Sequence, residues 1–392
     1  MTLDAEWPPT SVGVPRETDA DETRVAIVPA VVHQLTRSGL EVVVERGAGA
    51  SAGFPDDAYE THGARLGSRS DVREADIVVR VRGWGVDGLR RRSDSHPDQV
   101  VIGMADPMGS PRAVRAAAEA KLVAFALDLM PRITRAQPMD VLSSQATVAG
   151  YRAVLLAADR LPKLFPMLTT AAGTIPPAQV FVVGAGVAGL QAIATAHRLG
   201  AVVQAYDVRP AAKEEIESLG ARSVLLPLAP GDAQDPSGYA KELGDAFYRR
   251  QQELLATVVA GVDVVVTTAL IPGALAPVLI TADAVAGMHP GSVIVDCAAG
   301  HGGNCELTRR DETILTDNGV SILGPTNLPS TVPHDASLMY AKNVAAFLDL
   351  ITTGGRIALD EDDEIVRATL VTSAGRVVHP RVLEALEEVR DV

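Results

Sequence analysis

The sequence contains few of the features that mark secreted, membrane-spanning or metal-binding proteins. Its 392 residues include only two cysteines, Cys297 and Cys305, which excludes a disulfide framework and leaves no ligand pairs at zinc spacing. The first residues, MTLDAEWPPT, lack the apolar core of a secretory signal. No apolar run reaches the ~18 residues that cross a bilayer, because the longest candidate, 180–196, is interrupted by three glycines and a glutamine. We therefore expect a cytoplasmic chain with reduced thiols, no metal site and no direct membrane insertion.

Positive charge is also scarce. The chain has 35 Lys and Arg against 49 Asp and Glu, which gives a net charge of -14. Its one dense basic stretch, 90–92, is followed closely by Asp94. Because phosphate backbones are bound by clustered Lys and Arg, this distribution argues against a nucleic-acid partner.

The hydrophobic pattern predicts two α/β domains. Short apolar runs alternate with amphipathic stretches from Val12 onward, and a second such series begins at QVFVVGAG, which predicts parallel sheets covered on both faces. Long apolar helices are expected at 140–161 and 337–351, and a hairpin around 373–375. We expect two Rossmann-like, doubly wound domains joined by long helices. The first comprises residues 1–140 completed by 325–392, and residues 141–324 form the second.

A glycine motif marks the second domain. Gly184, Gly186 and Gly189 form G-x-G-x-x-G between a predicted strand and a predicted helix. Such glycines allow a tight turn, close approach to a pyrophosphate and close helix packing. The next residues, Val187 and Ala188, open a helix whose free N–H groups and dipole attract an anion. The motif therefore predicts a dinucleotide-binding site.

Asp207 indicates which dinucleotide binds. It follows the next predicted strand, 207 − 186 = 21 residues after the central glycine. A carboxylate there accepts hydrogen bonds from ribose hydroxyls. Its charge repels a 2′-phosphate and so favours NAD(H), although Arg209, next to Val208, prevents complete exclusion of NADP.

Two further loops are expected to cover the cofactor at the carboxyl ends of the strands. One contains Thr268, Ala269 and Leu270, and the other spans 298–304. Ordinary turn chemistry explains any single residue in these loops equally well.

Several other segments are more specific: PRITRAQPMDVLSSQATVAGYRAV (131–154), SGYAKE (237–242), TTALIPG (267–273), GSVIVDCAAGHGGNCE (291–306) and GPTNLPS (324–330). With the glycine motif, they resemble the NAD(H)-binding domain I, the soluble portion of the alpha subunit, of proton-translocating NAD(P) transhydrogenase. The resemblance runs from about Val12 to Pro380. Alanine dehydrogenase shares the fold and the weaker motifs.

The resemblance implies direct hydride transfer between NADH bound here and NADP⁺ bound on a separate domain III. A membrane domain II would couple this transfer to proton translocation. Both domains would lie on other chains, which implies a position peripheral to the membrane. The resemblance also implies a homodimer, paired through the second domain.

Site residues are implied as well. In the family a loop places Arg, Gln and Asp around the nicotinamide, and Arg132, Gln137 and Asp140 match them. Ser143 matches a residue that contacts the carboxamide, and Tyr239 matches the tip region of a mobile loop that closes over the nucleotide. Hydride transfer moves no proton, so such groups need only orient two rings. A structural salt bridge between Arg132 and Asp140 is the alternative.

Alanine dehydrogenase is the main alternative function. Arg24 matches that family's carboxylate-binding arginine, but Arg82, Asp106 and Gly300 stand where it has a lysine, a histidine and a catalytic aspartate. An arginine cannot act as a base, and a glycine has no acid/base group. Asp106 can titrate, and His301 lies beside Gly300, which keeps this alternative open. A non-catalytic module that senses NADH is the third hypothesis.

Overall fold

The computed structural model describes residues 9–85, 96–228, 244–271 and 275–388, and the chain divides into two compact units. Unit 1 comprises Met1–Gln145 and Val332–Val392, and unit 2 comprises Ala146–Thr331. The first boundary falls inside helix α5 (Val141–Arg160), and the second lies just before helix α10 (Pro333–Ile351). Within the described residues, no helix has both the length and the apolarity needed to cross a bilayer.

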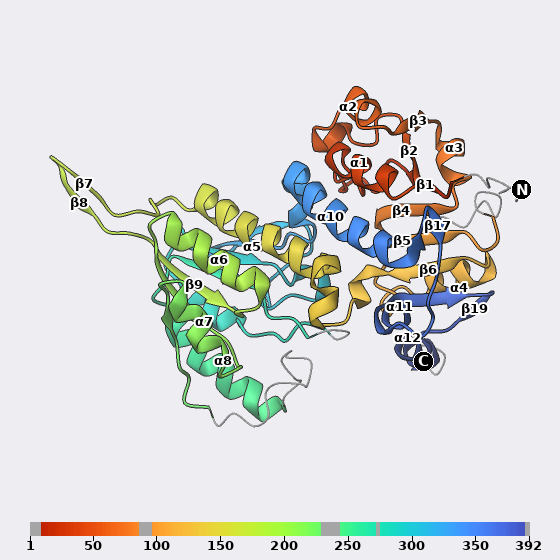
Figure 1. Ribbon diagram of the computed structural model, residues 1–392. Coiled ribbons are helices and arrows are strands. Elements are labelled where there is room, and N and C mark those ends of the chain that lie inside the picture. Colours follow the sequence, from red (N-terminus) through yellow and green to blue (C-terminus); the bar gives the residue numbers. More distant parts are fainter. Residues whose placement is uncertain (1–8, 86–95, 229–243, 272–274, 389–392) are drawn as a thin grey trace, which may run out of the picture. The chain divides into compact units, whose positions relative to one another are not determined.

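Unit 1 is built on a mainly parallel sheet, which the described residues form in the order β19-β18-β6-β5-β4-β1-β2-β3 (Figure 1). Its strands are β1 (Ser11–Val14), β2 (Glu41–Glu45), β3 (Arg65–Gly67), β4 (Ile77–Arg82), β5 (Val100–Met104), β6 (Val123–Ala126), β18 (Leu370–Ser373) and β19 (Arg376–Val377). Its helices are α1 (Pro29–Arg37), α2 (Asp56–Thr61), α3 (Arg69–Arg73), α4 (Pro111–Glu119), α10, α11 (Glu364–Thr369) and α12 (Pro380–Glu388). A separate two-stranded ribbon joins β16 (Thr352–Thr353) and β17 (Arg356–Ile357). Helices α1, α4 and α10 begin with proline, whose missing N–H costs nothing in a first turn.

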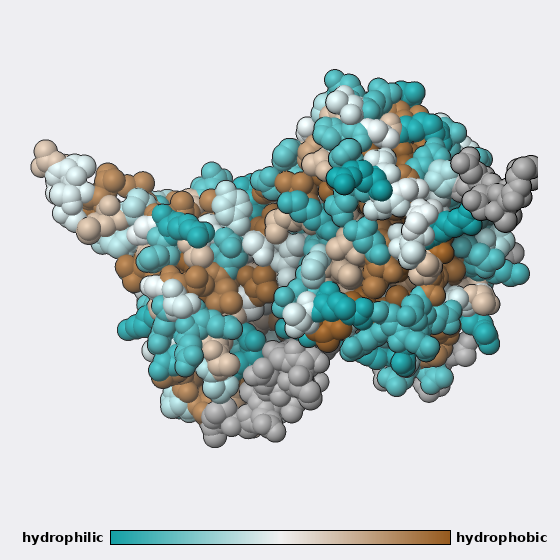
Figure 2. All heavy atoms as spheres, in the orientation of Figure 1, coloured by the Kyte–Doolittle hydropathy of each residue, from teal (hydrophilic) through white to brown (hydrophobic). Residues whose placement is uncertain are grey.

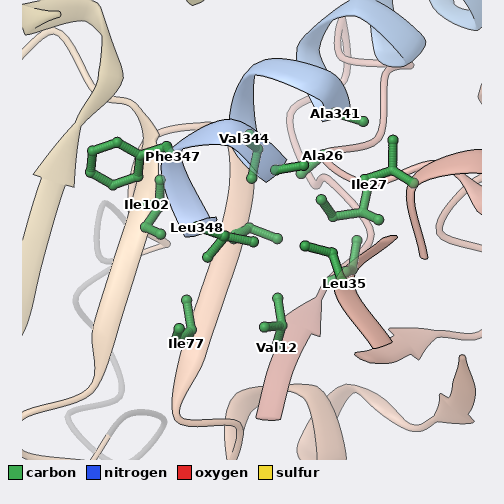
Figure 3. Packing of buried hydrophobic residues seen from close by; sticks show 14 of the residues in the cluster. Val12, Ala26, Ile27, Leu35, Ile77, Ile102, Ala341, Val344, Phe347 and Leu348 are labelled. Atoms are coloured by element: carbon green, nitrogen blue, oxygen red, sulfur yellow. The ribbon is translucent and has the colours of Figure 1, made fainter. Parts of the chain in front are cut away.

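Alternate residues of these strands enter two different cores. In β4, Ile77, Val79 and Val81 pack with α1 and α10, as Figure 3 shows for Ile77 with neighbours such as Leu35. Val78, on the opposite side of the strand, packs with residues of α4 and α12. Because side chains alternate along a strand, this division places helices on both faces of the sheet.

The end of the chain adds an antiparallel edge to unit 1. Strand β18 pairs antiparallel with both β6 and β19. The connecting residues Ala374 and Gly375 have φ of 50° and 74°, as a tight hairpin turn requires. The predicted hairpin is confirmed.

Unit 2 has the strand order β11-β10-β9-β12-β13-β15-β14 among its described residues. These strands are β9 (Gln179–Val183), β10 (Val202–Tyr206), β11 (Arg222–Ser223), β12 (Val264–Thr267), β13 (Val293–Asp296), β14 (Thr313–Leu315) and β15 (Ser321–Leu323). The helices besides α5 are α6 (Val187–Arg198), α7 (Ala212–Ser218), α8 (Asp245–Val259) and α9 (Ala282–Ala286). All pairings are parallel except that of β14 with β15.

The strands of unit 2 also serve two cores. Val180 and Val182 pack with residues of α5, α6 and α7, whereas Phe181 and Val183 pack with residues of α8 and α9. Both units are therefore α/β structures with two-sided cover, and the predicted fold class is confirmed.

Three local features differ from the predicted pattern. The strand expected at 222–228 is limited to Arg222–Ser223, and Pro227, which cannot donate to a ladder, lies just beyond it. The antiparallel edge strand β14 was not predicted. Nor was the hairpin of β7 (Leu168–Thr170) and β8 (Gly173–Ile175), whose residues are all exposed and so show no buried face in the sequence.

Candidate functional site

The glycine loop of unit 2 lies at the point where the strand order reverses. From β9 the chain passes to β10 on one side, and β12 pairs with the other side of β9. Parallel sheets bind ligands in the crevice beyond such a switch point. The loops that follow β9 and β12 touch here, since Thr268 Oγ1 donates to Gly184 O at 3.0 Å.

Each glycine of the loop meets a different physical demand. Gly184 has φ of 96°, which a side chain strains. A Cβ on Gly189 would lie 1.8 Å from Gly184 O, so this glycine lets α6 pack closely on the loop. A Cβ on Gly186 would meet nothing within 4 Å. Gly186 therefore faces open space rather than protein.

The beginning of α6 fits an anion. The helix starts at Val187, and no side chain caps it at Gly186. Val187 is exposed, and Ala188 is partly buried. An uncapped helix start beside open space is what the pyrophosphate of a dinucleotide requires.

Asp207 braces the glycine loop in this structure. Its Oδ2 accepts from the backbone N–H of Ala185 at 2.7 Å, and its Oδ1 accepts from the backbone N–H of Arg209 at 2.8 Å. The Arg209 side chain also donates to this carboxylate, through Nε at 2.9 Å and Nη2 at 3.2 Å. This ion pair raises the pKa of the Arg209 guanidinium. Val208, between them, is partly buried.

Asn304 holds the loop after β12. Its side chain is fully buried; Oδ1 accepts from Ala269 N at 3.0 Å, and Nδ2 donates to Ala269 O and Pro277 O, each at 2.9 Å. Leu270, the next residue, is exposed. The sequence placed residue 304 in a covering loop but gave no sign that its amide ties that loop to the residues after β12.

Asp296 organises the same region from the end of β13. This fully buried carboxylate accepts from Thr267 Oγ1, Thr308 Oγ1 and the N–H groups of Ala298 and Cys305, at 2.7 to 3.0 Å. Four donors satisfy the buried charge. Sequence reasoning missed Asp296, although an acid that ends a β-strand at this edge of a parallel sheet is a usable signal.

The two cysteines flank this carboxylate. Burial, with a smaller contribution from the charge of Asp296, raises the pKa of both thiols, that of Cys305 to about 11. Both thiols are therefore protonated near neutral pH, and a thiol is a poor nucleophile and metal ligand. In the described residues, no group of His, Cys, Asp and Glu is arranged to hold a metal ion.

The implied nicotinamide residues lie in unit 1. Asp140 Oδ1 accepts from the backbone N–H of Ser143 at 2.9 Å, and Ser143 Oγ donates to Asp140 Oδ2. Asp140 thus caps α5. Gln137 is exposed in the 3₁₀ segment Thr134–Met139, and Asp140 N donates to its carbonyl at 3.3 Å. Arg132 is also exposed. The structure joins Gln137, Asp140 and Ser143 in one turn.

Helix α10 supports this turn within unit 1. Asn343 Nδ2 donates to the carbonyl of Pro138 at 2.7 Å. Arg135, also in the 3₁₀ segment, pairs with Asp363, the N-cap of α11. Tyr239 and residues 272–273 of the loop after β12 lie outside the described residues.

Arg24 is engaged by protein groups. Its guanidinium donates to both oxygens of Glu22 at 2.7 Å and to Gln145 Oε1 at 2.7 Å. All three side chains are buried. Arg24 therefore ties the segment before α1 to the first turns of α5.

The other positions that match the alanine dehydrogenase pattern have varied surroundings. Arg82, on β4, pairs with Asp21 at 3.0 Å. Asp106 is exposed, with φ of 41°, and its N–H donates to Asp128 at 2.8 Å. Gly300 and His301 are exposed in the loop after β13.

Two buried carboxyl groups in unit 1 were not predicted. Burial raises the pKa of Glu17 to about 7, although Arg80 lies 3.5 Å away and Val81 N donates to it. Burial likewise raises the pKa of Asp128 to about 6. Only tertiary burial distinguishes these acids from the surface acids of the sequence.

Comparison with family models and curated proteins covers nearly the whole chain. The C-terminal and N-terminal domain models of alanine dehydrogenase/PNT match residues 153–380 and 13–149. The first of the chains that make up the alpha subunit of NAD(P) transhydrogenase in Rhodospirillum rubrum is 44% identical over 376 residues, which cover 94% of this chain and 98% of that protein.

Solved structures agree with this similarity. A transhydrogenase from Sinorhizobium meliloti superimposes with a TM-score of 0.85 at 45% identity, covering 94% of this chain and 100% of the other. An L-alanine dehydrogenase superimposes with a TM-score of 0.79 at 25% identity, covering 97% and 100%. The chain therefore belongs to the alanine dehydrogenase/PNT family and, within it, to the NAD(H)-binding alpha-subunit chains of NAD(P) transhydrogenase.

Proposed function

We propose that this chain aims bound NADH for direct hydride transfer to NADP⁺ held on a separate domain. The observation that carries the proposal is the uncapped glycine loop of unit 2, with open space at Gly186, in a transhydrogenase alpha subunit. Bound NADH supplies the hydride from its dihydronicotinamide ring. The role of the chain is to bind, orient and shield the cofactor, for which no acid or base is needed.

Four residues of unit 1 are proposed to orient the nicotinamide: Arg132, Gln137, Asp140 and Ser143. The exposed amide of Gln137 can both donate to and accept from a carboxamide, and the Arg132 guanidinium donates. Asp140 fixes the Ser143 hydroxyl through their hydrogen bond. This preorganisation supports a positioning role, because a misplacement of about 1 Å slows transfer by about a hundredfold.

Replacement of Gln137 separates this role from stability. Gln137→Ala should leave the cap on α5 and the unfolding temperature unchanged, because the Gln137 side chain is exposed. We expect hydride transfer to slow by about tenfold or more, at unchanged NADH affinity. The matched control is Gln34→Ala, at an exposed glutamine of α1. Equal transfer rates in both variants would contradict the proposal.

The proposed partners are an NADP(H)-binding domain III and a membrane domain II on other chains. Together they would couple hydride transfer to proton translocation and hold this chain peripheral to the membrane, on its cytoplasmic side. The support is membership among the alpha-subunit chains of NAD(P) transhydrogenase.

The overall activity is tested by reconstitution. The purified chain is mixed with NADP(H)-loaded domain III, and reduction of an NADP⁺ analogue by NADH is followed. Rapid transfer is expected, with no NADH oxidation by pyruvate plus ammonia. Oxidation by pyruvate plus ammonia alone would establish the alanine dehydrogenase function instead. NADH binding without either reaction would indicate a sensing module.

We also propose that two copies pair through the hairpin of unit 2. Strands β7 and β8 project from the sheet as an arm with brown and pale surface patches (Figures 1 and 2). Met167, Leu168 and Ile175 on it are 63%, 42% and 42% exposed. An isolated two-stranded hairpin is at best marginally stable in water, so a second copy would stabilise it by covering these side chains.

Sedimentation tests this pairing. Leu168→Asp together with Ile175→Asp should convert a dimer into a monomer with an intact NADH site. The control replaces Thr169 and Thr174, which bond to each other at 3.2 Å on the same arm, by serine. A double Asp variant that sediments as a dimer would refute pairing through the arm.

A further inference from the structure

The Asp207 carboxylate has no vacant acceptor position in this structure. A carboxylate has two oxygens with about four lone-pair sites. Oδ1 accepts from the backbone N–H and the Nε of Arg209, and Oδ2 accepts from Ala185 N–H and from Arg209 Nη2. A ribose diol, which donates two hydrogen bonds to such an acid, therefore finds every site taken.

Removal of one side chain resolves this conflict. If the Arg209 guanidinium leaves, one lone pair becomes vacant on each oxygen. The two backbone donors, Ala185 N–H and Arg209 N–H, continue to hold the carboxylate in place. Two vacant acceptors on neighbouring oxygens match the two hydroxyls of a ribose.

The guanidinium can leave at modest cost. The Arg209 side chain is 19% exposed, so it reaches solvent, whereas that of Asp207 is 9% exposed and anchored by backbone groups. After displacement the guanidinium stays two residues from Asp207. There it offsets the repulsion between the carboxylate and a 2′-phosphate.

We propose that Arg209 determines cofactor specificity by competing with the adenine ribose for Asp207. Its guanidinium lowers the affinity for NAD(H), because the cofactor must displace it. It also narrows the preference for NAD(H) over NADP(H), because it neutralises the carboxylate that discriminates between them. This inference rests on NAD(H) binding at the glycine loop and is independent of hydride transfer.

Fluorescence titration of the full chain with NADH and with NADPH tests the proposal. Arg209→Ala should bind NADH about three- to tenfold more tightly, as expected when a competing ion pair is removed. The same variant should bind NADPH no better, so the ratio of the two dissociation constants widens. Arg209→Lys, which keeps the charge without the fork, should fall between the variant and the original chain.

Arg222→Ala is the matched control for lost charge. Arg222 is exposed on the neighbouring strand β11 and donates to Gln204 at 2.6 Å. This control should change neither affinity. Unchanged or weaker NADH binding by Arg209→Ala, or an unchanged ratio, overturns the proposal and assigns Arg209 only to bracing the loop through Ala185 O. If the original chain binds neither nucleotide, the cofactor site itself fails instead.

Discussion

At the residue scale, the glycines of the cofactor loop are not equivalent. Gly186→Ala adds a methyl group to open space at a φ of −73° that alanine adopts freely. This variant should fold normally and bind NADH about ten- to a hundredfold more weakly, because the methyl group occupies space needed by the pyrophosphate.

Gly189→Ala is the contrasting change. Its Cβ would lie 1.8 Å from a backbone oxygen, so unit 2 should lose about 3 kcal/mol or more of stability. Urea unfolding and NADH titration separate the two outcomes. A destabilised Gly186→Ala, or a stable Gly189→Ala, would show that the loop packs differently.

Glu17 makes the stability of unit 1 depend on pH. Its pKa rises from 4.5 to about 7 on folding, so the native state binds more protons than the unfolded chain between these values. Stability is therefore greatest at low pH in this window and falls as pH rises through it, by about 3 kcal/mol for this group. Asp128 contributes a fall of the same sign between 3.8 and about 6.

The pH dependence above about 6 isolates Glu17, because Asp128 is by then largely ionised. Glu17→Gln should flatten the slope of unfolding free energy against pH in this range. Glu60→Gln, at an exposed position of α2, serves as the control and should retain the original slope. A slope that survives Glu17→Gln would assign the dependence to another group.

At the element scale, one amide connects two loops of the site. Asn304→Ala would leave Ala269 N–H, Ala269 O and Pro277 O without their partner, at a cost of about 2–4 kcal/mol. Asn304→Asp should be no better, because its carboxylate would face two carbonyl oxygens. Loss of this support should also weaken NADH binding, since Thr268 in the freed loop contacts Gly184.

Asn318→Ala provides the comparison. Asn318 donates to Val285 O at 3.0 Å and to two neighbouring carbonyls, away from the glycine loop. Its loss should destabilise unit 2 without changing NADH affinity. Denaturant unfolding and NADH titration of both variants test this. Equal effects on NADH binding would mean that Asn304 acts only through global stability.

At the scale of the whole molecule, each unit has its own core and only unit 2 carries the glycine loop. Scanning calorimetry should therefore show that NADH raises the unfolding temperature of one transition, that of unit 2. A ligand at a hundred times its dissociation constant stabilises by about 2.7 kcal/mol. In Gly186→Ala this shift should vanish. An equal shift of all transitions would show that NADH engages both units.

The sequence by itself determined the alternation of strands and helices, both long helices and the C-terminal hairpin. These depend on local periodicity and turn chemistry, as at Ala374 and Gly375. It also located the glycine loop and Asp207, since both requirements concern neighbouring residues. The hairpin of β7 and β8 escaped, because its exposed residues leave no buried pattern.

Only the tertiary structure decided what those residues contact. Asp207 meets Ala185, Asn304 meets Ala269, and Arg24 meets Gln145, although 22, 35 and 121 residues separate the partners. Burial similarly raised the pKa of Glu17 and Asp128, two acids with no distinguishing sequence pattern. Hydrogen bonding and desolvation depend on distances in space, and a one-dimensional pattern carries those distances only within a helix, a strand or a turn.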